Sequence, residues 1–361
     1  MPTISVLMPV YNAEAFVESA IRSVLDQTCA DFELIIVNDG SRDGSGEMIA
    51  RMALAETRIV ALDQENAGIV ASLNRAADMA RGDLLARMDA DDLALPRRFE
   101  LQHAAFLARP DLAALGGHAW VIDQAGRIVG PSYVPVGRRE ILRDIEFSSP
   151  LIHPAAMMRK TVFEQLGGYR SRYETAEDYD LWLRMLDAGY VIDNLNQMIL
   201  HYRQHPGGVS SSGRARQALA ASLARSASRM RRQGHSDQMA QDCPVDAVAI
   251  RGLPLSFRPC ESELLEAVHG PVTELDAEAL QEVLRGLLPR EHTKSCRWQS
   301  ASLQLRCGVI LLTRGCIMTG LAAIVSGLRT DPFAILRQLH RSTSNRLVRV
   351  RRRIAVKAQS S

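Results

Sequence analysis

One stretch of the sequence reads Leu84-Leu85-Ala86-Arg87-Met88-Asp89-Ala90-Asp91-Asp92, a short apolar strand that ends in three carboxylates. Carboxylates a few ångströms apart repel one another, and a divalent cation among them relieves that repulsion. The Asp-x-Asp spacing places Asp89 and Asp91 on the same side of an extended backbone, so that both can face one ion. Oxygen ligands without a neighbouring Cys or His suit Mg²⁺ or Mn²⁺, the ions that accompany a diphosphate. The stretch therefore predicts a metal–diphosphate site.

A simpler explanation gives these aspartates a structural task. Asp is favoured just before a helix, and Pro96 suits the first position of the helix that follows. That explanation accounts for one aspartate but not for three together. We therefore expect the metal site and keep helix capping as the alternative.

Apolar runs and helical patterns alternate along the first 90 residues. We expect strands at 4–10, 33–37, 58–62 and 84–86, and helices at 16–25, 45–55 and 69–80. Asn12 is expected to cap the first helix and Gly82 to end the third. This β-α-β-α-β-α-β order predicts an α/β fold with a parallel, doubly wound sheet and right-handed crossovers.

The elements expected after the acidic stretch are less regular. The pattern predicts a helix that ends near Arg109, strands at 112–116 and 119–123, a hairpin turn at Ala125-Gly126, a helix closed by Gly189 and a helix at 214–233.

Polar residues follow each of the first four strands. They are Tyr11 and Asn12, then Asp39, then Asn66 and Gly68, then Asp89 and Asp91. Ligands of doubly wound sheets bind beyond the carboxyl ends of the strands, so these residues predict one pocket at that edge. No Gly-x-Gly-x-x-Gly follows the first strand and no P-loop motif is present, which argues against a dinucleotide-binding fold and a P-loop enzyme.

Taken together and in this order, these motifs over residues 3–211 resemble glycosyltransferase family 2, the inverting nucleotide-sugar transferases with a GT-A fold. The segments that carry the resemblance are Ser5 to Asn12, Ile36 to Ser41, Asn66 to Gly68, Asp89 to Asp92, Gly167 to Tyr169, Glu177-Asp178 and Tyr202 to His205. The resemblance implies an α/β, GT-A, doubly wound and mostly parallel sheet, followed here by a mainly helical C-terminal region.

The resemblance also implies roles for individual residues. It assigns the donor nucleotide to Pro9, Tyr11, Asn12, Asp39, Asn66, Gly68 and Asp89, with Asp39 accepting a hydrogen bond from a uracil-like imide. It implies Mn²⁺ or Mg²⁺ held by Asp91, Asp89 and His205, and a diphosphate that pairs with Arg203. Arg87 either supports the acidic stretch or forms an ordinary salt bridge.

A second acidic group, Glu177, Asp178 and Asp180, opens a predicted helix. The helix dipole favours carboxylates there, which is a complete structural explanation. The resemblance instead implies that Asp178 is the general base that deprotonates the acceptor hydroxyl, with Glu177 as the alternative. We expect His153 to be structural or to line the substrate, and His201 to have no catalytic role.

The composition is that of an ordinary protein of about two domains, with 47% apolar and 23% charged residues in 361. We place a catalytic domain at 1–212 and a mainly helical accessory region at 213–361. The six cysteines lack Cys-x-x-Cys spacing, which predicts free thiols in a reducing compartment. No signal peptide precedes the first strand, so we expect a cytoplasmic enzyme.

The C-terminal region carries an apolar segment, 309–325, and a basic tail with nine Lys or Arg from Arg329 onward. Arg314 interrupts the apolar segment, so we expect no membrane span. The segment is either a core helix or an in-plane helix that, with the tail, contacts an anionic membrane surface. No aromatic residues interleave with the arginines of the tail, so we do not expect nucleic-acid binding.

The sequence thus predicts a metal-dependent inverting glycosyltransferase that takes its sugar from a nucleoside diphosphate, with UDP favoured, for a glycan or lipid-linked acceptor in cell-surface polysaccharide synthesis. Two alternatives share the fold. A sugar nucleotidyltransferase would carry a Gly-rich, basic first loop, and Ser5 to Asn12 contains neither Gly nor Lys. A non-catalytic module that binds nucleotide sugars would be expected to lack part of the acidic set.

Overall fold

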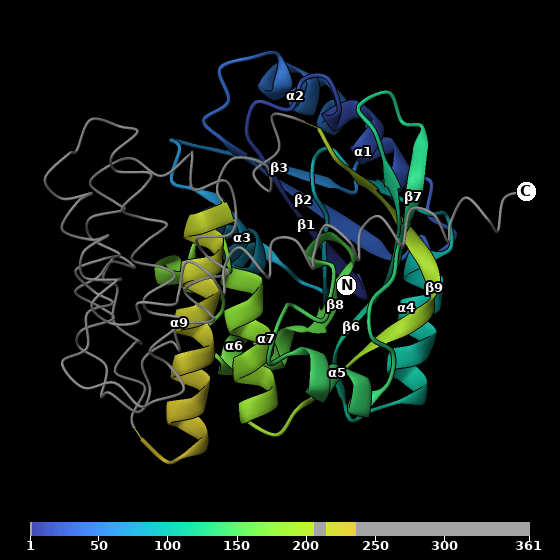
Figure 1. The fold of residues 1–361 in the computed structure, drawn as a ribbon. Helices are drawn as coiled ribbons and strands as arrows, with labels where there is room; N and C mark the ends of the chain where they lie inside the picture. Colours follow the sequence, from blue (N-terminus) through green and yellow to red (C-terminus); the bar gives the residue numbers. More distant parts are fainter. Residues whose placement is uncertain (1, 206–213, 236–361) are drawn as a thin grey trace, which may run out of the picture. The chain divides into compact units, whose positions relative to one another are not determined.

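The computed structural model describes residues 2–205 and 214–235 (Figure 1). Contacts divide the chain into two units, and the first comprises residues 1–213 and 223–243. The fold described below is that of the described residues of this first unit. The domain boundary predicted at residue 212 stays a prediction.

The N-terminal half of the sheet is parallel, as the sequence predicted. Its spatial order is β3 (Ile59–Gln64), β2 (Phe32–Asp39), β1 (Ile4–Val10) and β4 (Leu84–Arg87). The connections are α1 (Val17–Leu25), α2 (Ser45–Ala55) and α3 (Ile69–Met79). The carboxyl ends of β1 to β4 therefore meet at one edge of the sheet.

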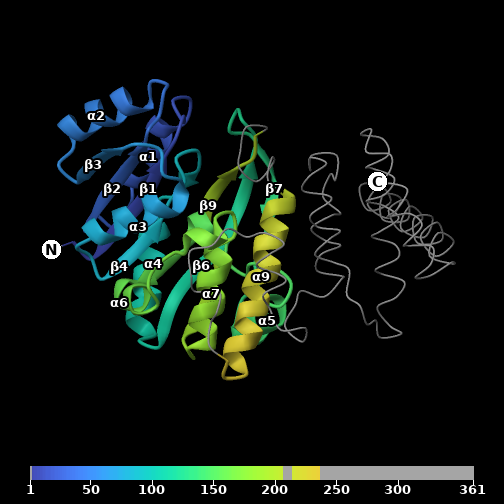
Figure 2. The ribbon, with the colours of Figure 1, turned by 90° about the vertical axis from the view of Figure 1, so that its left-hand side faces the viewer.

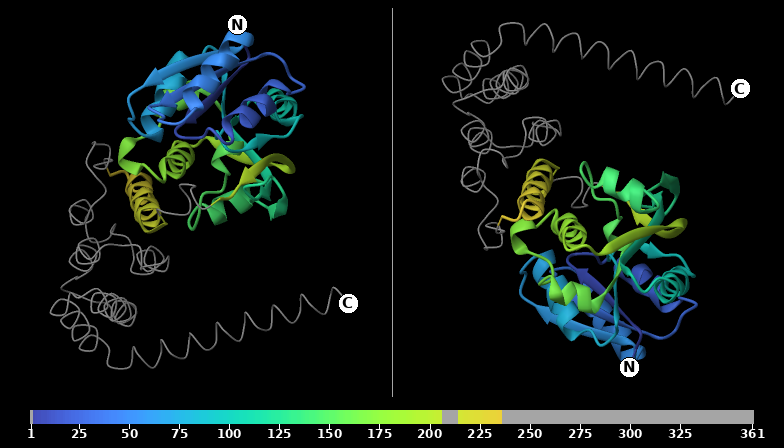
Figure 3. Two further views of the ribbon diagram at one scale, coloured as in Figure 1. Left: turned by 90° about the horizontal axis from the view of Figure 1, so that it is seen from above. Right: turned by 90° about the horizontal axis from the view of Figure 1, so that it is seen from below.

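The other half of the sheet is mixed. β8 (Met157–Arg159) pairs antiparallel with β4, and β6 (Leu112–Ile122) pairs antiparallel with β8. β9 (Val191–Arg203) runs parallel to β6, and β5 (Leu93–Ala94) pairs antiparallel with β9. β7 (Ile128–Ser132) forms a hairpin with β6. The two halves lie side by side (Figure 3). The two separate strands expected at 112–116 and 119–123 are one strand, β6. Its pairing with β9 shifts register around Gly117 and His118, and such bulges let a strand continue through a local irregularity.

Alternate residues of the central strands face different helices. Ile4, Val6 and Met8 of β1 belong to one apolar cluster with residues of α1, α2 and α4 (Arg98–Ala108). The intervening Leu7 is equally buried but lies outside that cluster, and α3 packs on the same two central strands, β1 and β2. Burial on both faces explains why these strands read as continuous apolar runs.

The remaining helices follow the mixed strands. They are α5 (Arg138–Asp144), α6 (Lys160–Gln165), α7 (Glu177–Asp187) and α9 (Arg214–Arg232), with short 3₁₀ turns η1 (His153–Ala155) and η2 (Ser171–Tyr173). Gly189 ends α7 as predicted: its φ is +86°, its N–H donates to the Leu186 carbonyl, and the Tyr190 N–H donates to Met185.

The second half of α9, from residue 223 onward, packs on α7 (Figures 1 and 2), and α9 lies where the sequence predicted a helix. Asp187, the last residue of α7, accepts hydrogen bonds from Ser228 Oγ at 2.8 Å and from Arg231 Nε at 2.9 Å. Residues 223–232 of α9 therefore cluster with the first unit.

Two capping predictions are wrong, each because a tertiary contact overrides a local preference. Helix α1 begins at Val17 without a side-chain cap, and the side-chain oxygen of Asn12 instead accepts from the Arg42 N–H at 2.8 Å. Gly82 does not end α3, which stops at Met79. A Cβ at Gly82 would lie 2.8 Å from the Ser5 nitrogen, so glycine is needed there for close approach to β1.

Within the described ranges, no helix is both long and apolar enough to cross a bilayer. Cys29 is a free thiol, as predicted. The other five cysteines, the apolar segment 309–325 and the basic tail lie outside the described residues, and membrane contact through that tail stays a prediction.

Candidate active site

The three aspartates after β4 form a cluster that could hold a metal ion. One carboxylate oxygen from each of Asp89, Asp91 and Asp92 lies within 4.8 Å of the others. Asp92 is fully buried and accepts a hydrogen bond from the Arg203 backbone N–H at 2.7 Å. The alternative of helix capping is wrong, because α4 begins at Arg98 with no side-chain cap.

His205, 114 residues from Asp91 in the chain, joins this cluster. Its Nε2 lies 3.0 Å from Asp91 Oδ2, and its ring packs on Phe16 with centroids 5.2 Å apart. Asp89 and Asp91 are each about a quarter exposed, so their carboxylates are open to a ligand. Carboxylates with one imidazole are a donor set that fits Mn²⁺ or Mg²⁺.

The electrostatics of the aspartates favour a cation. Burial raises the pKa of Asp92 well above its usual value, and the charges of Asp89 and Asp91 raise that pKa further. Burial also raises the pKa of Asp89, which Arg87 opposes and Asp91 reinforces. A divalent ion here would stabilise the ionised carboxylates.

Arg203 holds the loop that carries the aspartates. Its Nε donates to the Asp91 carbonyl at 2.7 Å, and its Nη1 donates to the carbonyls of Asp123 and Gln124 at 2.9 and 3.1 Å. The guanidinium also lies over the Phe16 ring, 4.8 Å from the centroid. These contacts give Arg203 a structural task, and its predicted pairing with a diphosphate stays a prediction.

Arg87 supports the acidic cluster directly. Its side chain is only 3% exposed, and its Nη2 forms an ion pair with Asp89. Burial lowers the pKa of Arg87, but the Asp89 carboxylate more than offsets this, so the pKa lies above its ordinary value. The sequence left open whether Arg87 supports the acidic cluster or forms an ordinary salt bridge. The ion pair with Asp89 does both, because Asp89 is a member of the cluster.

Asp39 lies at the edge where the carboxyl ends of the parallel strands meet. Its carboxylate accepts the backbone N–H groups of Ala67 at 2.8 Å and Gly68 at 2.9 Å, and the Gln64 side chain at 2.7 Å. Gly68 has a φ of +87°, which the tight turn into α3 requires. The Asn66 side chain donates to the Asp39 carbonyl at 3.1 Å. Asp39 thus fixes the start of α3, and its contact with a base stays a prediction.

The loop after β1 completes this edge. Tyr11 is 51% exposed, and Asn12 has a φ of +50° with its N–H donating to Ser41 Oγ at 3.0 Å. Pro9 lies in β1, two residues before Tyr11, and pairs with Val37 of β2. The structure therefore brings the predicted nucleotide residues to one edge, with an exposed aromatic ring among them.

The two acids that open α7 differ in environment. Glu177 is 5% exposed, and burial together with the Asp178 charge raises its pKa to about 7. Asp178 is partly exposed and accepts a hydrogen bond from Ser149 Oγ at 3.2 Å, while burial raises its pKa. Just before them, Thr175 has a φ of +86°, a strained conformation for a β-branched residue. Accessibility favours Asp178 over Glu177 as the group that meets a substrate.

His153 packs against Glu177 in the interior. Its Nδ1 lies 3.6 Å from Glu177 Oε1, and its Nε2 lies 2.9 Å from the Tyr169 hydroxyl. Burial, and then the Arg87 charge, lower the pKa of His153 well below its usual value, so the ring is neutral. No pattern in the sequence pairs His153 with Glu177 or Ser149 with Asp178, and only the fold reveals both contacts.

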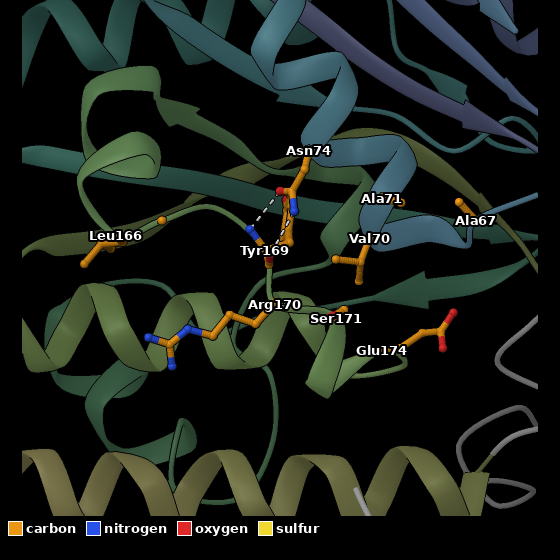
Figure 4. Close-up of a pocket in the computed structure, with 10 residues that line it drawn as sticks. Ala67, Val70, Ala71, Asn74, Leu166, Tyr169, Arg170, Ser171 and Glu174 are labelled. Carbon is orange, nitrogen blue, oxygen red and sulfur yellow. Dashed lines mark hydrogen bonds between the residues drawn. The ribbon is translucent and has the colours of Figure 1, made fainter. Parts of the chain in front are cut away.

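A cavity of about 470 Å³ opens between α3 and the loop that precedes α7 (Figure 4). Asn74 lines it and bonds both the N–H and the carbonyl of Tyr169, at 3.0 and 2.8 Å. Glu174 also lines the cavity, and a Cβ added at Gly68 would lie 2.7 Å from Glu174 Oε1. The cavity therefore adjoins Gly68, one of the residues predicted to bind the nucleotide.

Comparison with known proteins agrees with this geometry. The profile of the family described as "Glycosyl transferase family 2" matches residues 5–167. The O-antigen biosynthesis glycosyltransferase WbnJ of Escherichia coli is 32% identical over 215 residues, which cover 59% of this chain and 84% of that protein. The chain belongs to glycosyltransferase family 2. It is therefore a glycosyltransferase, as its motifs predicted.

Two further comparisons extend the family-2 assignment. The amylovoran biosynthesis glycosyltransferase AmsE of Erwinia amylovora is 28% identical over 202 residues, covering 55% of this chain and 75% of that protein. The structure of S. aureus TarS 1–349 in complex with UDP-GlcNAc superposes with a TM-score of 0.56 at 17% identity, covering 94% of this chain and 92% of that one. At that identity the likeness bears on the fold alone, which is the GT-A fold that the sequence predicted.

Proposed function

We propose that this family-2 enzyme transfers a sugar from a nucleoside diphosphate, with UDP as the favoured nucleotide, to a hydroxyl group with inversion at the anomeric carbon. The observation that carries the proposal is the pairing of two acidic groups in one site. Asp89, Asp91 and His205 suit a metal-bound diphosphate, whereas Asp178 on α7 is an accessible carboxylate outside that set. A diphosphate leaving group and an activated hydroxyl need two such groups.

The donor would lie along the edge formed by the ends of β1 to β4. The exposed ring of Tyr11 is suited to stack on a base. Gly68, at the turn into α3, would lie near the ribose. Asp91, Asp89 and His205 would hold Mn²⁺ or Mg²⁺, which when bound stabilises the charge that develops on the leaving diphosphate. The oxygen-rich donor set supports either ion.

Asp178 would act on the acceptor. The acceptor oxygen forms a bond to the anomeric carbon while the bond from that carbon to the diphosphate oxygen breaks on the opposite face. The acceptor proton passes to the Asp178 carboxylate, whose raised pKa makes it a stronger base than an exposed aspartate. Ser149, which donates to Asp178 Oδ2, would hold that carboxylate in orientation.

The acceptor class is proposed from the relatives. WbnJ is named for O-antigen biosynthesis and AmsE for amylovoran biosynthesis, both of them surface polysaccharides. We propose that the present enzyme likewise acts on a glycan or a lipid-linked glycan. The retention of Asp39, Asp91 and Asp178 in one fold disfavours a non-catalytic module, and the glycine-free first loop disfavours a sugar nucleotidyltransferase.

Calorimetry tests the donor site. UDP, GDP and dTDP are titrated into the full chain with and without Mn²⁺, using wild type, Asp91→Ala and the control Asp111→Ala. Asp111 lies before β6, at the end of the β6–β9 pair that is farther from Arg203 and His205. We expect one nucleotide to bind only with metal, and Asp91→Ala but not Asp111→Ala to abolish that binding. If none of the three binds to folded wild type, the proposed function is wrong.

The base is tested separately. Asp178→Asn is expected to bind the same nucleotide and Mn²⁺ as wild type but to lose turnover by about 10²-fold or more, because a general base contributes about 10²–10⁴-fold. Turnover is read as UDP release from UDP-sugars in the presence of candidate glycans. Wild-type turnover in Asp178→Asn together with loss in Glu177→Gln would reassign the base to Glu177.

A further inference from the structure

The active site holds two acidic groups on separate elements, the aspartates after β4 and the pair that opens α7. One buried cation acts on both. The charge of Arg87 opposes the protonation of Asp89 and Asp92 in the first group, and of Glu177 and Asp178 in the second.

The backbone of Arg87 is fixed on both sides. Arg87 ends β4, its N–H donates to the Ala156 carbonyl at 2.9 Å, and its own carbonyl accepts from Arg98 Nη2 at 2.8 Å. Ala156 follows η1, the turn that carries His153, and His153 in turn contacts Glu177. The backbone of Arg87 is thus bonded to the residue that follows η1, and η1 carries the histidine that contacts Glu177.

The hydrogen bonding of Arg87 is unlike that of a structural arginine. Within the described part of the chain, Arg87 Nε and Nη1 have no hydrogen-bond partner, and neither has Glu177 Oε2. By contrast, each side-chain nitrogen of Arg184, which is equally buried on α7, donates a hydrogen bond. Its Nε pairs with Asp180 at 2.7 Å, and Nη1 and Nη2 donate to the carbonyls of Leu166 and Gly168 at 2.7 Å each.

Burying a guanidinium with two unbonded donors costs free energy, which only a strong ion pair can offset. The one strong contact of Arg87 is to Asp89, a predicted ligand of the metal, whose carboxylate is otherwise partly exposed. Partners that orient metal ligands typically change metal affinity by about 10–100-fold when they are replaced.

We propose that Arg87 is a positioning residue for the transfer reaction: its buried ion pair fixes the Asp89 carboxylate for the metal. This inference rests on the proposed function, because it presumes a metal at Asp89 and Asp91. A shift of about 1 Å between reacting groups can cost about 10²-fold in rate, so the position of the Asp89 carboxylate bears directly on the transfer reaction.

Arg87→Lys separates positioning from charge. Lysine keeps the positive charge, but its side chain is shorter and ends in a single ammonium group, so it does not place a donor where Arg87 Nη2 meets Asp89. Mn²⁺ binding to the full chain with saturating UDP is measured by calorimetry for wild type, Arg87→Lys, Arg87→Met and the matched control Arg184→Lys. We expect Arg87→Lys to weaken Mn²⁺ binding by 10-fold or more and Arg184→Lys to leave it within about threefold.

Arg87→Met, which removes the charge, tests the competing explanation that Arg87 affects the ion through its charge alone. If Arg87 acted on the ion only through its charge, Arg87→Met would bind Mn²⁺ more tightly than wild type and Arg87→Lys would be unchanged. That pattern would overturn the proposal. Thermal melts establish that each variant is folded, and an Arg87→Lys that does not fold while Arg184→Lys does would also overturn it, since Arg87 would then serve the fold.

The outcomes distinguish the two proposals. Wild type that binds no nucleotide with Mn²⁺ contradicts the proposed function. Wild type that binds Mn²⁺ and UDP, together with an Arg87→Lys variant that binds them equally well, contradicts only the assignment of Arg87.

Discussion

Replacing Glu177 with glutamine is expected to stabilise the metal-free protein at pH 8 and to leave it nearly unchanged at pH 4.5. The side chain is 5% exposed at the start of α7, where burial and the neighbouring Asp178 charge raise its pKa from 4.5 to about 7. The native state therefore binds a proton that the unfolded chain releases at lower pH. Glutamine is neutral at every pH and nearly the same shape, so it removes this penalty.

The sign and size follow from linkage. Because the folded pKa lies above the unfolded one, the stabilising effect of the protonated group is fully present below pH 4.5 and is lost as the pH rises through 7. The difference between those two values corresponds to on the order of 3 kcal/mol at pH 8. Asp92 and Asp178, whose pKa values are also raised, add to the fall in wild-type stability in the same direction.

Urea unfolding in EDTA, followed by circular dichroism from pH 4.5 to 8, measures the effect. The curve for Glu177→Gln should be flatter than that for wild type. Glu164→Gln, on α6 with a 59% exposed side chain, is the control and should follow wild type. Equal slopes for wild type and Glu177→Gln, or a less stable Glu177→Gln at pH 8, would refute the reasoning.

Three further predictions concern the backbone and the nucleotide edge. Gly82→Ala should lower the free energy of unfolding by about 1–3 kcal/mol, because the added Cβ would meet the backbone of β1. The control Gly130→Ala should leave it unchanged, because nothing lies within 4 Å of a Cβ there. Equal urea midpoints for the two variants would contradict this. Thr175→Gly should raise the melting temperature by relieving about 1 kcal/mol of strain at φ +86°, and a lower melting temperature would count against strain there. Tyr11→Ala should weaken UDP binding by about 10-fold without changing the melting temperature, because a stacked base is worth about 1–3 kcal/mol; unchanged affinity in calorimetry would show that the ring does not stack.

The parallel half of the sheet could be predicted because its signals are local. The apolar runs of β1 and β2 and the helical spacing of α1 each depend on neighbours in the sequence. The capping residues could not be predicted in the same way. Asn12 turns toward Arg42 and Gly82 approaches Ser5, and both contacts depend on segments that are distant in the chain.

The candidate site divides along the same line. The spacing of Asp89 and Asp91 was enough to predict a metal site, whereas His205 entered only through the family resemblance, since no local rule brings together residues 114 apart. The contacts of His153 with Glu177 and of Ser149 with Asp178 had no signal in the sequence. Such pairings follow from how η1 and the segment before it pack against α7, which is a property of the whole fold.

The contacts of Arg203 have a consequence for how this part of the enzyme can change over generations. Arg203 binds main-chain carbonyls at 91, 123 and 124, and a carbonyl is present whatever the side chain. The residue at 124 is therefore free to be replaced, but an insertion or deletion at that point would move the carbonyl away from Arg203. Beyond it, Ile128 and Val129 of β7 are exposed, so the outer hairpin can diversify in sequence without disturbing the loop that bears Asp91.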